Sequence, residues 1–233
     1  MAKVYKDDKS WFQDFRDQFK SLDGQPFRKK VEHFFTYYSR LTIAILVGLF
    51  VVGSLIGTII YNSRPMLITG AFYPGTISEN GDALLKTAVA EKLGVNETKY
   101  RSEIASYVVD QESAEQVQAV NQAIIAGIMG KSLDFLVMTK DQFAGLMDKD
   151  DPDSCVMADL SSFLPEETYK RLLSEDRILT YETNFSGEIP YLIKVDDSEL
   201  SDMVELTGKD NYLGIIVNTP RQEAVSALTD LIR

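Results

Sequence analysis

Histidine and cysteine are almost absent from this chain of 233 residues, which contains one of each, His33 and Cys155. A single cysteine cannot form an intramolecular disulfide, so we expect no covalent cross-link to stabilise the fold. The apolar run described below separates the two residues, which excludes Cys/His and Ser/His catalytic pairs from the part that contains Cys155. We interpret Cys155 as a buried structural residue, with a free reactive thiol as the alternative. We therefore expect no catalytic residues and a protein that is not an enzyme.

Long apolar runs are equally scarce, since Leu41 to Tyr61 is the one stretch of 21 residues without charge or proline. At about 1.5 Å per residue it spans roughly 30 Å, the thickness of the hydrocarbon core of a bilayer. A cleaved secretory signal is the competing interpretation, but 40 residues precede the run and no A-x-A-like cleavage site follows it. We predict a membrane-spanning helix that begins before Leu41. The expected organisation is a cytoplasmic segment (1–33), a transmembrane helix with flanking aromatic residues (34–62) and an extracytoplasmic domain (66–233).

The cations that flank the run predict its orientation in the membrane. Four of them, Arg28, Lys29, Lys30 and Arg40, lie before it, whereas only Arg64 lies just after it. Cations near a span are retained preferentially on the cytoplasmic side. We expect a single-pass, type II protein of the cell membrane, with the N-terminus cytoplasmic and the C-terminal domain extracytoplasmic.

Charge is distributed unequally between the two sides of the run. Residues 1–40 carry nine basic and six acidic side chains, whereas residues 65–233 carry 14 basic and 29 acidic ones, a net charge of −15. Such an acidic surface repels nucleic acids and anionic lipid, and it attracts cations and basic partners. We expect no binding to nucleic acid.

Two features of the first 61 residues suggest further contacts. Large apolar residues lie on one helical face near the N-terminus, where an amphipathic helix would bind either the inner leaflet or another protein: Trp11, Phe12, Phe15, Phe19 and Leu22. Within the apolar run, Gly53 and Gly57 form a G-x-x-x-G pair that would let two helices approach closely as a homodimer. The alternative is that these glycines reflect only the ordinary frequency of glycine in membrane helices.

Predicted strands and helices alternate after the run. We expect strands at 66–73, 100–110, 133–138, 178–183, 191–195 and 213–218, and helices at 78–93, 113–129, 140–147, 161–173, 198–206 and 221–232. The apolar side of the helix at 113–129, which we expect to face the core, contains Val117, Val120, Ile124, Ile125 and Ile128. This alternation predicts an α/β domain with one open, largely parallel sheet flanked by helices.

Three stretches of this domain resemble one lobe of the extracytoplasmic solute-binding proteins of ABC transporters. They are the opening strand, the segment GKSLDFLVMTKDQFAGLM with the VMADLSSFLPEE that follows it, and the closing YLGIIVNTPRQEAVSALTDLI. The aromatic segment EHFFTYYSR before the span, followed by the strand LITGAFY, also resembles a group of uncharacterised single-pass membrane proteins of Gram-positive anaerobic bacteria. The first resemblance implies a lobe that binds a solute, with a transporter component as its partner.

The chain departs from the solute-binding pattern because it is too short for a second lobe. Only about 40 residues separate Leu173 from Leu213. A ligand would therefore bind on an open face at the carboxyl ends of the strands, the usual location in open α/β sheets. The loops at 73–78, 139–142 and 218–221 supply the candidate ligand-binding residues, which are Tyr73, Thr76, Ser78, Thr139, Lys140, Asn218 and Arg221.

The acidic loop at 148–153 is the strongest candidate for a metal site, because hard cations prefer clustered carboxylate oxygens. It lacks the glycine at the sixth position and the glutamate at the twelfth position of an EF-hand loop, where Asp153 and Asp159 stand instead. We interpret it as a solvated loop, and we expect neither a metal nor a cofactor.

These features predict a non-enzymatic membrane-anchored protein that binds or assembles with another membrane or envelope protein, such as a transporter component. The alternative is a single-pass sensor, in which a small solute or cation binds at the carboxyl edge of the sheet.

Overall fold

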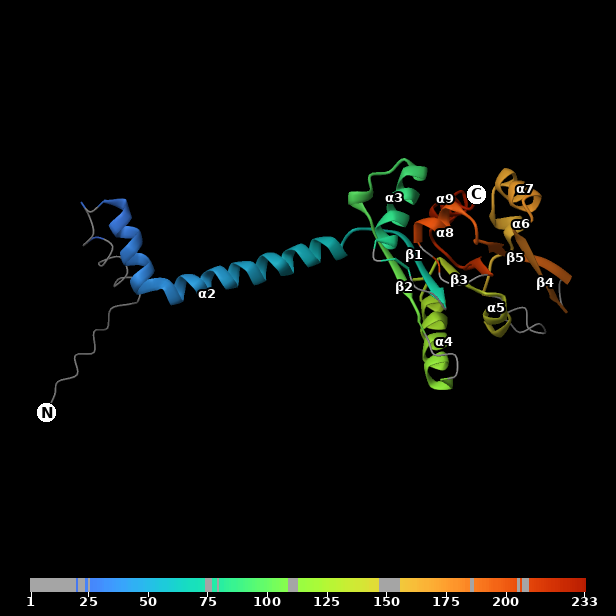
Figure 1. Ribbon diagram of the computed structural model, residues 1–233, viewed down its shortest axis with the longest axis horizontal. Coiled ribbons are helices and arrows are strands. Elements are labelled where there is room, and N and C mark those ends of the chain that lie inside the picture. Colours follow the sequence, from blue (N-terminus) through green and yellow to red (C-terminus); the bar gives the residue numbers. More distant parts are fainter. Residues whose placement is uncertain are drawn as a thin grey trace. The chain divides into compact units, whose positions relative to one another are not determined.

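The computed structural model describes residues 20, 24, 26–73, 77–78, 80–108, 113–146, 156–184, 187–204, 206 and 210–233. The chain divides into two compact units, Met1–Tyr61 and Asn62–Arg233. Figure 1 labels the helices and strands of both units.

The first unit contains the long helix α2 (Phe27–Asn62). Its segment Ile43–Asn62 is long and apolar enough to cross a membrane, and none of that segment is buried. The prediction that the helix begins before Leu41 is confirmed, and the segment is compatible with a single-pass membrane protein. No side chain lies within 4 Å of the position that a Cβ atom would take at Gly53 or Gly57. The apolar residues between Trp11 and Leu22 and the loop at 148–153 with Cys155 lie outside the described residues.

The second unit is an α/β domain built on a six-stranded sheet. The strands are β1 (Met66–Tyr73), β2 (Arg101–Ser106), β3 (Phe135–Thr139), β4 (Ile178–Thr183), β5 (Gly187–Lys194) and β6 (Asn211–Ile215). Their spatial order is β2-β1-β3-β6-β5-β4. The helices are α3 (Gly81–Leu93), α4 (Ala114–Met129), α5 (Lys140–Leu146), α6 (Leu160–Phe163), α7 (Glu166–Ser174), α8 (Glu199–Val204) and α9 (Gln222–Thr229), with a short 3-10 turn η1 (Glu97–Lys99).

The sheet is mixed, which corrects the expectation that it is largely parallel. Strand β1 pairs in parallel with β2 and β3, whereas the β3–β6, β5–β6 and β4–β5 pairs are antiparallel. Only three residues separate the end of β4 from the start of β5, and so short a connection can only reverse the chain direction. Strand β6 then runs antiparallel to both of its neighbours, so the carboxyl end of β6 lies at the opposite edge from those of β1 and β3.

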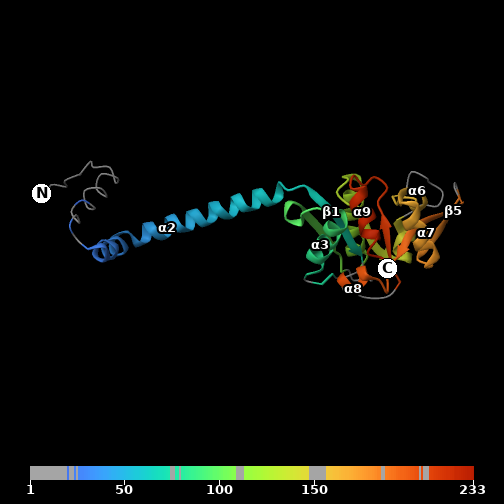
Figure 2. The same ribbon diagram turned by 90° about the horizontal axis from the view of Figure 1, so that it is seen from above.

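Helices cover both faces of the sheet and create two apolar cores. The larger core lies under α3, α8 and α9, of which α3 contacts the other two, and includes Phe72, Phe135 and Val225; Figure 2 shows α3 and α8 together on one side of the strands. The smaller core lies under α4 and α5 and includes Ile124 and Phe143. Right-handed crossovers from β1 to β2 and from β2 to β3 place α3 and α4 on opposite faces.

Helix α4 is less buried than its apolar sequence predicts. Of its 16 residues only Ile124 and Ile128 are buried, whereas Ile125 and Met129 are 46% and 77% exposed. The expectation that Ile125 belongs to the core is therefore wrong. One face of the helix packs on the sheet, and Ile125 lies one residue, about 100°, away from the buried Ile124.

Candidate functional site

The carboxyl ends of β1 and β3 meet at the centre of the parallel part of the sheet. Tyr73, the last residue of β1, is the register partner of Met138, and Thr139 and Lys140 follow directly. The crossover that follows β1 covers one face of the sheet, and the crossover that leads to β3 covers the other. The carboxyl ends of β1 and β3 therefore form a topological switch point, where ligands commonly bind in α/β folds. The structure thus brings together Tyr73, Thr139 and Lys140. Thr76 lies outside the described residues.

Most of these residues take part in internal contacts. Burial raises the pKa of the Tyr73 phenol above its ordinary value of 10.0, and its ring belongs to the smaller core. The backbone N–H and the hydroxyl of Thr139 donate to Oε1 of Gln142 at 3.0 and 2.9 Å, which caps the start of α5. The backbone N–H of Ser78 donates to the carbonyl of Val204 at 3.1 Å. Lys140 is the exposed member of this group.

Asn218 and Arg221 lie at the opposite edge of the sheet, because β6 is antiparallel to β3. The loop 218–221 therefore does not converge with the loops after β1 and β3, contrary to the expectation from the sequence. Asn218 donates from Nδ2 to the carbonyl of Ile128 at 3.0 Å, which joins this loop to the end of α4. Carboxyl ends share an edge only when the strands are parallel, and the sequence pattern did not reveal the direction of β6.

A buried carboxylate organises this second edge. Asp134, directly before β3, is fully buried and accepts hydrogen bonds from the backbone N–H of Thr69 (2.7 Å), the hydroxyl of Thr219 (2.5 Å) and Nε of Arg221 (2.7 Å). Its backbone also exchanges hydrogen bonds with Thr69 and Ile216. A buried carboxylate requires a partner of opposite charge, here Arg221, and several hydrogen-bond donors to offset its lost hydration. Asp134 thereby ties β1, β3 and the loop before α9 together.

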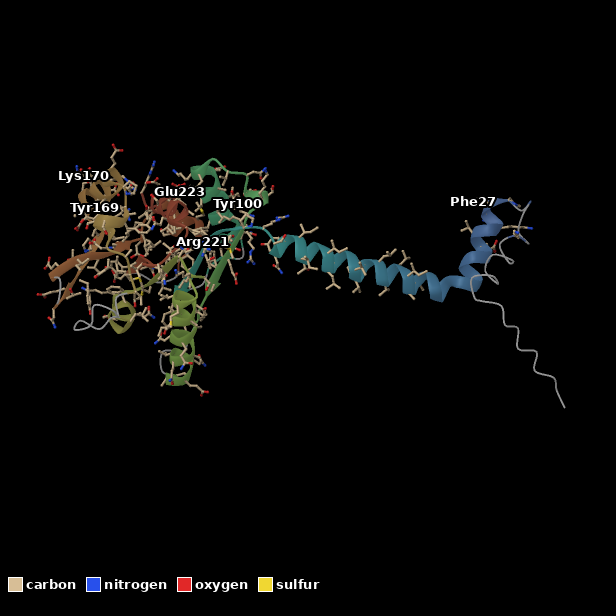
Figure 3. All side chains as sticks on the ribbon, turned by 180° about the vertical axis from the view of Figure 1, so that it is seen from behind. Phe27, Tyr100, Tyr169, Lys170, Arg221 and Glu223 are labelled. Atoms are coloured by element: carbon tan, nitrogen blue, oxygen red, sulfur yellow. The ribbon has the colours of Figure 1, made fainter. Side chains whose placement is uncertain are left out.

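An open cleft of about 550 Å³ adjoins Arg221 at this edge. Its walls are mostly apolar and come from β1, the end of α3 and the start of β2, while the loop before α9 and its first turn supply polar groups. This Arg221 cleft is lined by Met66, Leu67, Leu93, Val95, Tyr100, Thr219, Pro220, Arg221, Gln222, Glu223 and Ala224. Figure 3 labels Tyr100, Arg221 and Glu223.

The Arg221 cleft combines an apolar wall with a guanidinium whose charge is already balanced. Nε of Arg221 is paired with Asp134, and Nη2 is buried without a hydrogen-bond partner among the described residues. Glu223 contributes a carboxylate in the first turn of α9. An apolar cleft with a few convergent polar groups is the usual form of a ligand-binding site. Among the described residues, no group of three His, Cys, Asp or Glu side chains could hold a metal ion.

The residues that the sequence analysis missed at this edge are Asp134, Thr69 and Thr219. Asp134 interrupts an apolar run, Leu133 to Met138, which we predicted to be a strand. A carboxylate in such a strand must have a buried partner, so this interruption was a usable signal. The identity of the partner was not visible, because Arg221 is 87 residues further along the chain.

Comparisons with known proteins identify no relative. No protein-family model matches the chain, and no curated protein and no solved structure matches it significantly.

Proposed function

We propose that this chain is a single-pass membrane protein whose α/β domain is a non-enzymatic binding module on the extracytoplasmic side. In this proposal the domain is equivalent to one lobe of a solute-binding protein and recognises another membrane or envelope protein, such as a transporter component.

The observation that carries the proposal is the exposed apolar side of α4. Ile125 and Met129 are four residues apart, so they lie on the same side of the helix. Val108, between β2 and α4, is also largely exposed. Large apolar side chains gathered on an exposed helix are typical of protein-interaction surfaces. Only two of the 16 residues of α4 are buried, so this helix presents most of its surface to solvent or a partner.

The linker and the charge of the domain restrict the kind of partner. Ser63, Arg64 and Pro65 connect the apolar helix to β1, so Asn62 and Met66 lie no more than about 14 Å apart even when the chain is fully extended. A domain on so short a linker stays near the membrane surface, which favours a partner that is itself held there. The net charge of −15 on residues 65–233 favours a partner with a basic surface.

Purification of the full-length protein from its native membrane after mild cross-linking tests this proposal. We expect a stoichiometric membrane or envelope protein, which is lost from the Ile125→Asp and Met129→Asp variants. Leu173→Asp is the matched control, because Leu173 is an equally exposed apolar residue on a different helix, α7. Retention of the partner by both α4 variants, or its loss from the Leu173→Asp variant as well, would contradict an interface on α4.

The proposed orientation has a separate test with a membrane-impermeant thiol reagent. In a Cys155→Ser background, a cysteine that replaces Glu182, an exposed residue of β4, should react in intact cells. A cysteine that replaces Ser10 should react only after permeabilisation. The reverse pattern would place the α/β domain on the cytoplasmic side.

A second candidate function is the sensing of a small solute, and the Arg221 cleft favours it. In this alternative a ligand binds the domain and the signal passes through the apolar helix to residues 1–33. The same purification discriminates between the two candidates, since a bound small molecule without a protein partner would favour sensing.

A further inference from the structure

A second cleft, of about 350 Å³, lies between α4 and the strands β1 and β2. We call it the α4 cleft, and the residues that determine its character are Thr69, Glu103, Ala105, Tyr107, Ile124 and Gly127. It lies on the opposite face of the sheet from α3, because α3 and α4 cover opposite faces.

The α4 cleft stays open because the residues on both of its walls are small. Ala71 and Ala105 are register partners on adjacent strands and form the floor. Ala123, Ala126 and Gly127 face them from α4. Side chains of this size leave part of the space between the helix and the sheet unfilled. Ile124 and Leu133 make part of the remaining wall apolar.

One end of the α4 cleft is polar. Thr69 and Glu103 are register partners on β1 and β2, so their side chains are neighbours on the same face of the sheet. Thr69 is 9% exposed, and its hydroxyl has no hydrogen-bond partner among the described residues. Glu103 forms no ion pair with another described residue. A buried hydroxyl without a partner and the carboxylate of an exposed residue therefore lie next to each other at this end of the α4 cleft.

Hydrogen bonds to Asp134 hold the backbone of Thr69 in place. Its backbone N–H donates to Asp134 Oδ2, and its carbonyl accepts from the backbone N–H of Asp134. Because the backbone is held in this way, the hydroxyl needs little ordering when a ligand binds, which favours affinity.

We propose that the α4 cleft binds a small primary amine with an apolar body. The ammonium group donates hydrogen bonds to the Glu103 carboxylate and to the Thr69 hydroxyl oxygen. The body lies over Ala105 and against Ile124, toward Tyr107, which is four residues and therefore about 13 Å along the strand direction from Glu103. The acidic charge of the domain raises the local concentration of cations. This inference goes beyond the proposed protein-binding function and does not depend on it.

Calorimetric titration of the full-length protein in lipid nanodiscs tests the inference with three probes of similar shape. The probes are phenethylamine, phenethyl alcohol and phenylpropanoate, which are cationic, neutral and anionic. We expect saturable binding of phenethylamine, with the alcohol at least about tenfold weaker and the acid weaker still, because charge-assisted hydrogen bonds are the stronger ones. Equal binding of the amine and the alcohol, or no saturable binding of the amine, would overturn the proposal.

Three variants locate the binding. Glu103→Gln should weaken phenethylamine by about tenfold, whereas Glu182→Gln, the same change on the other edge strand, should leave it unchanged. Ala126→Leu places a larger side chain in the α4 cleft from an exposed helical position and should abolish binding without loss of folding, as checked by circular dichroism. Unchanged affinity in either Glu103→Gln or Ala126→Leu would place the amine elsewhere. The titrations measure binding of the amine to the purified protein, whereas the proposed protein partner is identified by purification from the native membrane. One proposal can therefore fail without the other.

Discussion

Asp134 and Arg221 form an ion pair across 87 residues of sequence, with 2.7 Å between Nε and Oδ2. Asp134 is fully buried, and the side chain of Arg221 is 20% exposed. The pair connects the start of β3 to the loop before α9, so it determines how the closing segment of the chain is held against the parallel strands.

Removal of the Asp134 carboxylate should strongly lower the stability of the domain. We expect Asp134→Ala to lower the free energy of unfolding of the domain by about 3–5 kcal/mol, since it leaves a guanidinium and two further donors unpaired in the interior. Urea unfolding measures this. Glu166→Ala is the matched control, because it removes the partner of Lys170 in an exposed pair and should change the stability by less than about 1 kcal/mol. Similar losses in both variants would contradict a special role for Asp134.

Gly70 cannot carry a side chain in this fold. A Cβ atom at this position would lie 2.1 Å from Cζ of Phe135, its register partner on β3. The Phe135 ring is fully buried and is 6.1 Å from the Phe72 ring in an edge-on arrangement, so it has no free space into which it can move. We expect Gly70→Ala to destabilise the domain by about 1–3 kcal/mol. If the clash is the cause, Gly70→Ala should lower the free energy of unfolding by less in a Phe135→Leu background than in the unchanged chain.

Two other glycines should respond in opposite ways. A Cβ atom at Gly127, inside α4, would meet its nearest neighbour, Cβ of Leu133, at 3.5 Å, an ordinary contact. Gly127→Ala should therefore stabilise the domain by about 0.5–1 kcal/mol through helix propensity. Gly94 ends α3 with φ of 65° in the left-handed region, so Gly94→Ala should destabilise by about 1 kcal/mol although no atom is near. Thermal unfolding compares the two, and the same sign for both would contradict these assignments.

Stability should fall at alkaline pH because of Tyr73. Burial raises its pKa in the folded domain above the ordinary value of 10.0, so the unfolded chain loses this proton first. The contribution of the neutral phenol is therefore fully present below pH 10 and is lost as the pH rises from there through the folded pKa. Urea unfolding between pH 9 and pH 11.5 should show this decline, and Tyr73→Phe should make it shallower. An unchanged slope in Tyr73→Phe would assign the decline to other groups.

The pair Gly53 and Gly57 predicts a homodimer of the apolar helix. We expect Gly53→Ile and Gly57→Ile to reduce cross-linking between full-length chains in membranes, because the larger side chains keep the helices apart. Gly48→Ile is the control, since Gly48 lies in the same helix with equally open surroundings but outside this G-x-x-x-G pair. If all three variants cross-link as the unchanged chain does, the glycines do not form a dimer interface.

Local sequence patterns predicted most elements of the fold. Strand β1 has the predicted bounds Met66–Tyr73, and α4 begins one residue after the predicted start at Ser113 and ends at Met129 as predicted. The apolar run was recognised as helical, and the structure includes it in α2. Such features depend on residues close together in the chain, so periodicity, turns and composition suffice to find them.

The candidate site was only partly predictable. Tyr73 and Thr139 come together as the loops after β1 and β3 indicated, whereas Asn218 and Arg221 lie at the other edge. A central strand such as β6 is covered on both faces of the sheet whichever way it runs, so its sequence is apolar in both cases. Periodicity therefore carries no information about its direction.

The sequence by itself determined the apolar helix, the acidic balance of the following domain and the alternation of strands and helices, because these depend on composition and on neighbouring residues. Only the tertiary structure decided that β6 runs antiparallel, that Asp134 pairs with Arg221 and that Thr69 lies beside Glu103 under α4. Each of these relationships joins residues that are tens of positions apart, and the packing of the whole domain selects among many alternatives that have the same local pattern.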